Sequence, residues 1–372
     1  MPWSGATGEL FGVSLTRRST EETEASAETG AVAGAGAGAG VDEPAGRPGR
    51  PGRGTGRAVV VLVLVAVGAL IPLFGPRVAL DGTGEAEAPG TGGIALLRTV
   101  LLAALCVPVG ELFVARLVRR VPDAPGRAPR SWAPWAAGAG LVASLGLASV
   151  VATGNLVPDS PADMDVGGLY ETRDGKLALL EVNAFAAAGL LALSRRPAVQ
   201  ALPLAAVVVA EALRAHPSTD HHDPLVGTAL TLVHLTCAAL WAGGLLHVLR
   251  ILHTRAWRSS GPGTALLGLY ARVAAVLLAA VTASGVCSTL RRMPPGTVLD
   301  QLTETAYGRA LLAKVLLVTA VAVLALWARL RLRRATDDPL GACAPARAEV
   351  VVLGAVVAVS ALLTALPLPI RW

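Results

Sequence analysis

The chain has few charged and few aromatic residues for its length. Only 16% of its 372 residues are Asp, Glu, Lys or Arg, and only 4% are Phe, Trp or Tyr. An ordinary soluble domain has roughly 25% charged residues, whereas this chain is 53% hydrophobic. So few charges cannot cover so much apolar surface in water. The composition therefore excludes a soluble enzyme, a disordered protein and a coiled coil, and it predicts that the surrounding solvent is lipid.

Cysteine is scarce as well. The four cysteines, Cys106, Cys237, Cys287 and Cys343, lie far apart, and none belongs to a CxxC pair. This spacing excludes a zinc knuckle and a thioredoxin motif, and a disulfide framework is not expected in a chain of this size and class. The net charge of +6 comes from Arg residues that punctuate apolar runs. That pattern is typical of membrane topology, so membrane lipid is an expected partner and nucleic acid is not.

The first 57 residues differ from the rest of the chain. They are polar and of low complexity, with an AVAGAGAGAG run from Ala31 and a GRPGRPGRGTGR segment. Such a stretch buries too little apolar surface to offset the entropy of ordering. The sequence therefore predicts a disordered cytoplasmic tail over 1–57 and a transmembrane helix bundle over 58–372.

Apolar runs of membrane-spanning length recur after the tail. A span needs about 20 apolar residues, within a range of roughly 17 to 25. Nine runs qualify, at 58–74, 95–118, 133–155, 177–194, 198–215, 227–249, 265–288, 309–328 and 348–367. They are too long and too uniformly apolar for barrel strands. The sequence predicts an all-α, polytopic bundle of about nine transmembrane helices.

The charges between these runs predict an orientation. With the N-terminus inside, the inner loops hold fifteen cations and three acids, whereas the outer loops and ends hold nine cations and twelve acids. The excess of cations on one side follows the positive-inside rule. We therefore expect the N-terminus inside and the C-terminus outside.

Ionisable residues within spans are costly and therefore informative. Those of interest here are Glu111, Glu181, Glu211, Arg272, Lys314 and Glu349. Glu349, Lys314 and Glu211 lie near helix ends, where long side chains can reach the interface. Internal ion pairs that fix the bundle are the alternative, above all for Glu111 and Arg272.

Histidines mark a candidate metal path. All six lie between 216 and 253, and three of them (His216, His221 and His222) lie in the outer-loop segment HPSTDHHDP. Imidazole and carboxylate groups together suit a divalent transition metal, although the same loop also fits a solvated connector. In the next span, His234 and Cys237 are three residues apart and share one helix face.

Thiol and imidazole ligands together favour copper, especially Cu(I). Cys287 and Met293 fall at the outer end of a later span and extend the set of candidate ligands. The alternatives are a His234 hydrogen-bonded between helices and cysteines that merely fill space. Copper would be a transported ion, and no organic cofactor is expected.

Four segments in the last part of the chain form a recognisable pattern: LVHLTCAALWAGGLL (232–246), YARVAAVLLAAVTASGV (270–286), TAYGRALLAKVLL (305–317) and ALLTALPLP (361–369). Through them, residues 226–367 show a resemblance to the copper resistance protein D (CopD) family of membrane proteins. It implies an eight-helix unit formed by the second to ninth spans, with the first helix as an addition. Among the family-like positions, Gly243 and Gly244 are expected to let helices approach, and Trp241 is expected to pack.

The resemblance also implies a function. It implies copper transport, in the import direction, or copper resistance, at a bacterial plasma membrane. A separate extracytoplasmic copper-binding protein is a candidate partner. The chain has only three methionines, so it lacks a Met-rich copper ladder.

Other functions remain open from the sequence. A b-haem redox protein needs paired histidines at similar depth, and a copper-delivery or assembly factor for cuproenzymes would carry the same residues. Catalysis is not expected, because no Ser-His-Asp arrangement, H-E-x-x-H motif or nucleotide loop occurs. Without a nucleotide site, transport would be passive or ion-coupled, with Glu111, Glu181 or Glu211 as candidate proton sites.

Overall fold

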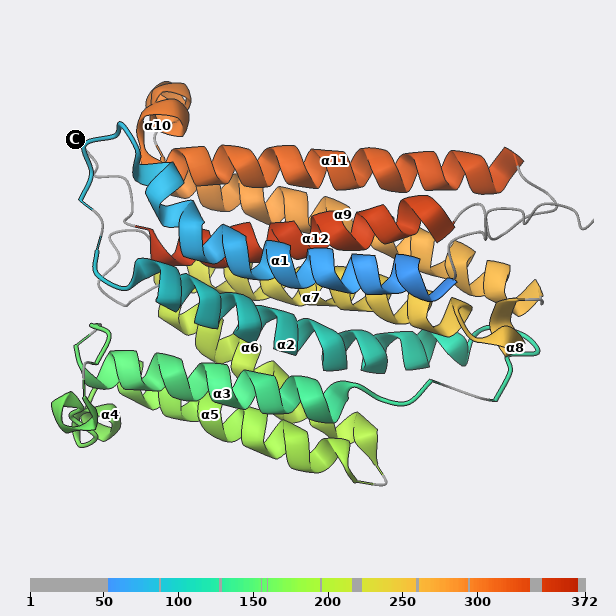
Figure 1. The fold of residues 1–372 in the computed structure, drawn as a ribbon, viewed down its shortest axis with the longest axis horizontal. Helices are drawn as coiled ribbons and strands as arrows, with labels where there is room; N and C mark the ends of the chain where they lie inside the picture. Colours follow the sequence, from blue (N-terminus) through green and yellow to red (C-terminus); the bar gives the residue numbers. More distant parts are fainter. Residues whose placement is uncertain are drawn as a thin grey trace, which may run out of the picture. The chain divides into compact units, whose positions relative to one another are not determined.

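The computed structural model describes one helical unit. It describes residues 53–366, except 87, 127–128, 155, 159, 195, 216–222, 259–260, 294 and 335–342. Within these ranges the secondary structure consists of helices joined by turns, without a β-strand (Figure 1). The predicted all-α class is confirmed.

Nine helices among the described residues are long and apolar enough to cross a membrane. They are α1 (Arg53–Leu80), α2 (Thr91–Val118), α3 (Ala133–Ala152), α5 (Arg173–Ala192), α6 (Ala201–Ala215) together with the 3-10 turn Pro197–Gln200 that leads into it, α7 (Pro224–Leu252), α9 (Gly261–Arg292), α11 (Ala306–Arg334) and α12 (Cys343–Ala365). Each coincides with one predicted run, so the predicted multi-pass architecture is confirmed.

Short helices lie in the connections between spans. They are α4 (Gly168–Glu171), α8 (Arg255–Arg258) and α10 (Val298–Glu304), together with the 3-10 turns Pro161–Asp163 and Pro295–Thr297. Hydropathy predicts none of them, because a helix of one or two turns is too short for a periodic signal.

The boundaries of α1 differ from the prediction. The helix begins at Arg53, so residues 53–57 are helical although the prediction assigned them to the tail. Extending an existing helix costs little, because each added residue contributes one hydrogen bond. At its other end, α1 continues through Pro72 and Pro76 to Leu80. Membrane helices tolerate proline, because neighbouring groups satisfy the freed backbone carbonyls.

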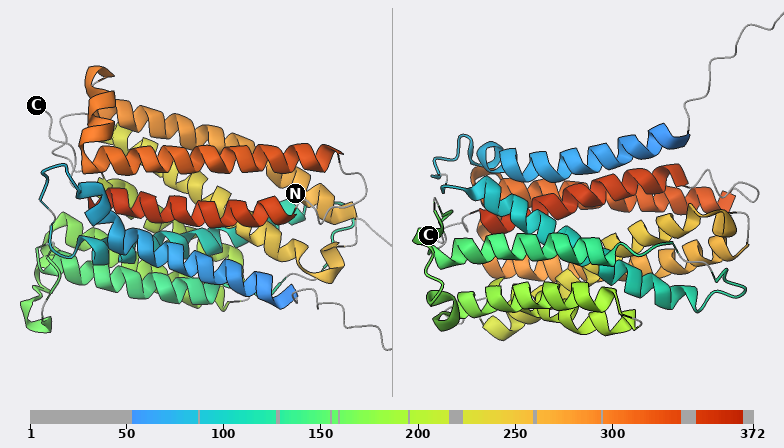
Figure 2. Two further views of the ribbon diagram at one scale, coloured as in Figure 1. Left: turned by 45° about the horizontal axis from the view of Figure 1, so that its top comes forward. Right: turned by 60° about the horizontal axis from the view of Figure 1, so that its bottom comes forward.

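The order of packing differs from the order in sequence. Helix α2 packs against α1, α3, α7 and α12, while α7 also packs against α6 and α9. Helices α3, α5 and α6 form one side of the described bundle, and α12 lies between α1 and α11 (Figures 1 and 2). Consequently α1, which comes early in the chain, has α12 as a main neighbour.

Three apolar clusters fill the spaces between these helices. One joins α2, α7 and α9 around Val114, Trp241 and Leu266. A second joins α2, α3, α5 and α6 around Phe185, and a third joins α1, α11 and α12 around Leu362. Each cluster holds a different set of helices together, so the core is distributed along the bundle.

Glycines bring α2 and α7 into backbone contact. A Cβ built on Gly243 would lie 1.8 Å from the Cys106 carbonyl oxygen, and one built on Gly110 would lie 2.1 Å from the Gly243 carbonyl carbon. A Cβ built on Gly244 would lie 2.9 Å from Tyr270 Cε2 and 3.1 Å from Phe113 Cδ1. The expectation that this glycine pair permits close helix approach is confirmed, as is the packing role of Trp241, which is buried in the first cluster.

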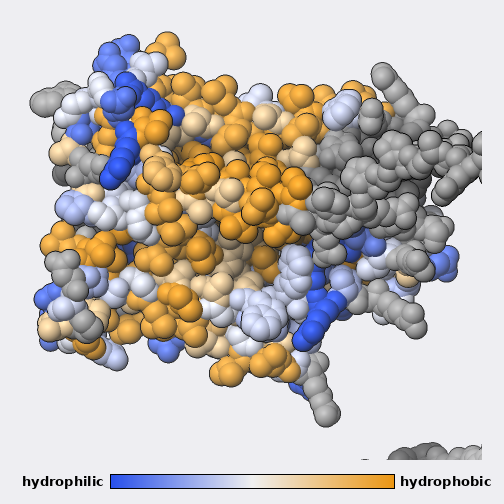
Figure 3. Space-filling view, viewed as in Figure 1, coloured by the Kyte–Doolittle hydropathy of each residue, from blue (hydrophilic) through white to orange (hydrophobic). Residues whose placement is uncertain are grey.

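The outer surface of the helices is apolar. Large hydrophobic side chains such as Leu62, Trp135, Val276 and Leu316 are exposed on different spans. On the face drawn in Figure 3, hydrophobic residues cover the middle of the helices and hydrophilic residues gather toward their ends. Such a surface is stable in a lipid bilayer and unstable in water.

Candidate functional site

His234 lies at the contact between α7 and α9. Its ring is half-buried, and Nδ1 lies 3.0 Å from the Ser284 hydroxyl oxygen. The Ser284 hydroxyl has its one proton available to two backbone carbonyls of its own helix, those of Ala280 at 2.7 Å and Val281 at 3.1 Å. The imidazole Nδ1–H is therefore the donor to Ser284 in the neutral ring, and this tautomer puts the lone pair on Nε2.

The thiol groups near His234 have different environments. Cys237, three residues further along α7, is half-buried and packs beside the α2–α7–α9 cluster. Cys287 is exposed on α9, two residues beyond Gly285, where an added Cβ would lie 3.6 Å from His234 Cε1. Both thiols thus lie on the same two helices as His234.

The other candidate ligands are not gathered around His234. Met293 is only 1% exposed and packs in the third apolar cluster, with Tyr307 and Leu362. His216, His221 and His222 lie outside the described residues. Over the described ranges, no three His, Cys, Asp or Glu side chains come together as a metal-binding group.

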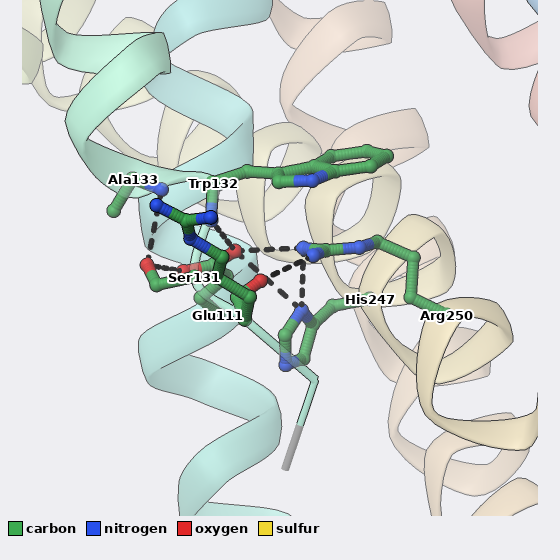
Figure 4. Close-up of polar contacts among 7 residues, drawn as sticks. Glu111, Ser131, Trp132, Ala133, His247 and Arg250 are labelled. Atoms are coloured by element: carbon green, nitrogen blue, oxygen red, sulfur yellow. Dashed lines mark hydrogen bonds and ion pairs between the residues drawn. The ribbon is translucent and has the colours of Figure 1, made fainter. Parts of the chain in front are cut away.

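Glu111 forms the centre of a polar cluster between α2, α7 and the segment before α3. Its Oε1 lies 2.8 Å from Arg250 Nη1 and 3.8 Å from His247 Nδ1. It also accepts hydrogen bonds from the Trp132 amide at 2.7 Å and from the Ser131 hydroxyl. Figure 4 shows the Glu111 carboxylate surrounded by these groups. Glu111 thus forms an internal ion pair with Arg250.

Glu181, Glu211 and Arg214 form a second polar cluster between α5 and α6. Arg214 lies 3.0 Å from Glu181 Oε2 and 3.1 Å from Glu211 Oε1. The Glu181 side chain is 1% exposed, and those of Glu211 and Arg214 are 11% and 13% exposed. One buried and one partly buried carboxylate thus share one guanidinium.

The remaining ionisable residues of the spans are placed in contrasting surroundings. Glu349 is buried within the bundle, at 6% exposure. Lys314 is half-buried on α11, whereas Arg272 is exposed on α9.

Arg309, at a family-like position, has a clear structural role. It donates hydrogen bonds to the backbone carbonyls of Thr303 and Asp81. The first bond ties the start of α11 to α10, and the second ties it to the residue that follows α1.

Several polar partners could not be identified from the sequence. Arg250 and Arg214 belong to the loop-and-end cations of the topology pattern, yet each pairs with a carboxylate of another helix. Nothing in the sequence around Ser284 distinguishes it from the other small residues of α9, so its contact with His234 could not be predicted. The spacing of Arg250 three residues after His247 is the one available signal, since it places both on one face of α7.

The histidines bear on the haem alternative. His234 and His247 are on α7, and His253 caps its end. Bis-histidine ligation requires two rings at similar depth on facing helices. The described histidines do not provide that arrangement.

Comparison with known proteins identifies a protein family that matches part of the chain. The model of the family CopD, copper resistance protein D, matches residues 264–363. Residues 264–363 belong to the CopD family. This stretch covers α9 to α12 and lies inside the region that resembles the family by its motifs, so the resemblance is confirmed. No curated protein and no solved structure gives a match.

The family and the helices together define the protein coarsely. The CopD match and the nine apolar helices of the described residues are those of a multi-pass copper resistance membrane protein. His234 and Cys237 lie before the matched stretch, on α7, whereas Ser284 and Cys287 lie within it.

Proposed function

We propose that this protein carries copper ions inward across a bacterial plasma membrane, along a path between α7 and α9. The CopD match over α9 to α12 is the observation that carries the proposal, because it links the bundle to copper. Supporting it, His234 is half-buried inside a span and contacts a helix of the matched region through Ser284.

His234 would act as the first ligand within the membrane. The hydrogen bond from Nδ1 to Ser284 fixes the ring and leaves Nε2 as the ligand atom, as second-shell partners do at metal sites. Cys237 lies one helical turn further along α7, so a soft thiol follows the imidazole along the path. Such a pair suits Cu(I), and Cys287 on α9 supplies a third soft donor.

Outside the membrane, His216, His221 and His222 would collect the ion before it reaches His234. A separate extracytoplasmic copper-binding protein would deliver it to them, and Met293 would be a further soft ligand near this end. Transport would be passive or coupled to another ion, because the sequence has no nucleotide-binding motif.

Copper binding by purified protein tests the ligand assignment. We expect the wild-type chain to bind copper in detergent, and His234→Ala combined with alanine at 216, 221 and 222 to abolish that binding. His253→Ala is the matched control, because this ring contacts the Leu249 carbonyl at the end of α7 and lies off the proposed path. Unchanged copper stoichiometry in the quadruple variant would refute the site.

Copper accumulation in cells tests the direction. Cells that express the protein should accumulate more copper than cells that lack it, across a titration of external copper. Lower copper content would show export instead. Unchanged copper content together with reduced cuproenzyme activity in cells lacking the protein would favour a delivery factor.

A further inference from the structure

The Glu181–Glu211–Arg214 cluster contains more negative than positive charge. Among the described residues, Arg214 is the cation that pairs with both carboxylates, at 3.0 Å from Glu181 and 3.1 Å from Glu211. If both carboxyl groups were ionised, the cluster would carry a net charge of −1 inside the bundle. An uncompensated charge in such surroundings is strongly unfavourable, and a buried carboxyl group normally gains a proton instead.

The hydrogen bonds of the cluster indicate where that proton lies. Within the part of the chain that the structure describes, Glu181 Oε1 has no hydrogen-bond partner, although its side chain is 1% exposed. The Glu211 carboxyl group lies within hydrogen-bonding reach of the Glu181 side chain. Two ionised carboxylates are both acceptors and cannot bond to each other, whereas one proton between them makes one group a donor.

The neighbouring elements supply few other charges. Helix α3, which packs against α5, has no charged residue between Ala133 and Ala152. On α7 and α2, which pack against α6, His234 contacts Ser284 and Glu111 pairs with Arg250. Other charged groups at the same ends of the packed elements include Glu171, Arg173, Asp174, Lys176, Arg98 and Asp223. Of these, Asp174 interacts with Arg214, but its side chain is exposed, so water compensates its charge and it is not part of the buried cluster.

From these observations we infer that Glu181 and Glu211 form a proton-binding site. The pair holds one shared proton at neutral pH, and Arg214 balances the remaining negative charge. The site lies on α5 and α6, outside the stretch that matches the CopD family. Glu111 differs from it, because the Arg250 guanidinium, the Trp132 amide and the Ser131 hydroxyl already bond to its single carboxylate.

Infrared spectroscopy of the copper-free protein tests the inference. The hydrated wild-type protein at neutral pH should show the C=O stretch of a protonated carboxylic acid, shifted by exchange into D₂O. Glu181→Gln and Glu211→Gln should each remove that band. The band should also disappear reversibly at alkaline pH. The measurement needs no copper, so its outcome is independent of whether the chain transports copper.

Two further variants serve as controls. Glu111→Gln should leave the acid band unchanged, because its carboxylate is ion-paired. Glu349→Gln removes the other buried carboxyl group, so any part of the acid band that it contributes is identified by its loss in this variant. If Glu181→Gln fails to fold, Glu211→Gln decides the matter, since its side chain is the more exposed of the two. A wild-type spectrum without an acid band that depends on Glu211 would overturn the inference.

Discussion

The Arg250 guanidinium makes three kinds of contact at one end of α7. It forms an ion pair with Glu111 at 2.8 Å and donates to the Arg130 carbonyl at 2.6 Å. It also stacks on the Trp132 indole, at 3.6 Å from the ring centroid. The planar, five-donor fork of arginine allows all three at once, and a lysine ammonium could not reproduce this geometry. Arg250 therefore fixes the segment before α3 onto α2 and α7.

Replacement of Arg250 should destabilise the bundle. Arg250→Ala leaves Glu111 buried without its cation, and removing one partner of a buried ion pair costs about 3 kcal/mol. We expect faster loss of the monodisperse peak in size-exclusion chromatography after heating in detergent. Arg119→Ala, an exposed arginine at the same end of α2, should lose the peak at the wild-type rate. Equal heat sensitivity of the two variants would contradict this role.

At the scale of helices, the closest contact is between α2 and α7. Their backbones meet at Gly110 and Gly243, where neither residue leaves room for a Cβ. Membrane helices gain little from hydrophobic association, so close backbone packing is a main source of their attraction. This contact also sets the distance between Glu111, one residue after Gly110, and the Arg250 face of α7.

A methyl group at this contact should force the helices apart. Gly243→Ala should cost about 1–3 kcal/mol, the usual cost of overpacking, measured by the same heating assay. Gly268→Ala is a matched control, because a Cβ at that position in α9 meets no atom within 4 Å. This control should be neutral or slightly stabilising, since alanine favours helix over glycine. Similar losses in both variants would argue against the close contact.

The spans are the part of the fold that the sequence predicts well. Hydropathy over about 20 residues identifies a span whatever its neighbours are. It misses helix ends such as the arginine-rich end of α11 at Arg334, which lies beyond the apolar run. It also cannot pair Glu111 with Arg250, 139 residues away, because apolar helices are interchangeable as neighbours. His234 can be selected from its chemistry, but Ser284 becomes visible only when α7 and α9 are placed together.

At the scale of the whole molecule, the distribution of charge predicts one orientation in the membrane. The loops predicted to be inside hold fifteen of the counted cations and only three acids. Such a bias determines topology during insertion, because cationic loops are retained on the cytoplasmic side. The Glu111–Arg250 cluster would then lie toward the cytoplasm, and the Glu181–Glu211 pair toward the outside.

Labelling of single cysteines tests this orientation. In a background with the four native cysteines replaced by alanine, Ala162→Cys and Gly126→Cys place thiols in two exposed connections. In intact cells a membrane-impermeant maleimide should label Ala162→Cys and should reach Gly126→Cys only after permeabilisation. The reverse pattern would invert the predicted topology.

The packing of α1 against α12 has a consequence for the synthesis of the protein. Leu64 of α1 meets Gly354 of α12, which leaves the ribosome nearly three hundred residues later. At a synthesis rate of roughly 5–20 residues per second, about 15 to 60 s pass between the synthesis of Leu64 and that of Gly354. During that interval the α12-facing side of α1 contacts lipid or the insertion machinery. The contact between α1 and α12 can therefore form only after α12 has been synthesised and inserted.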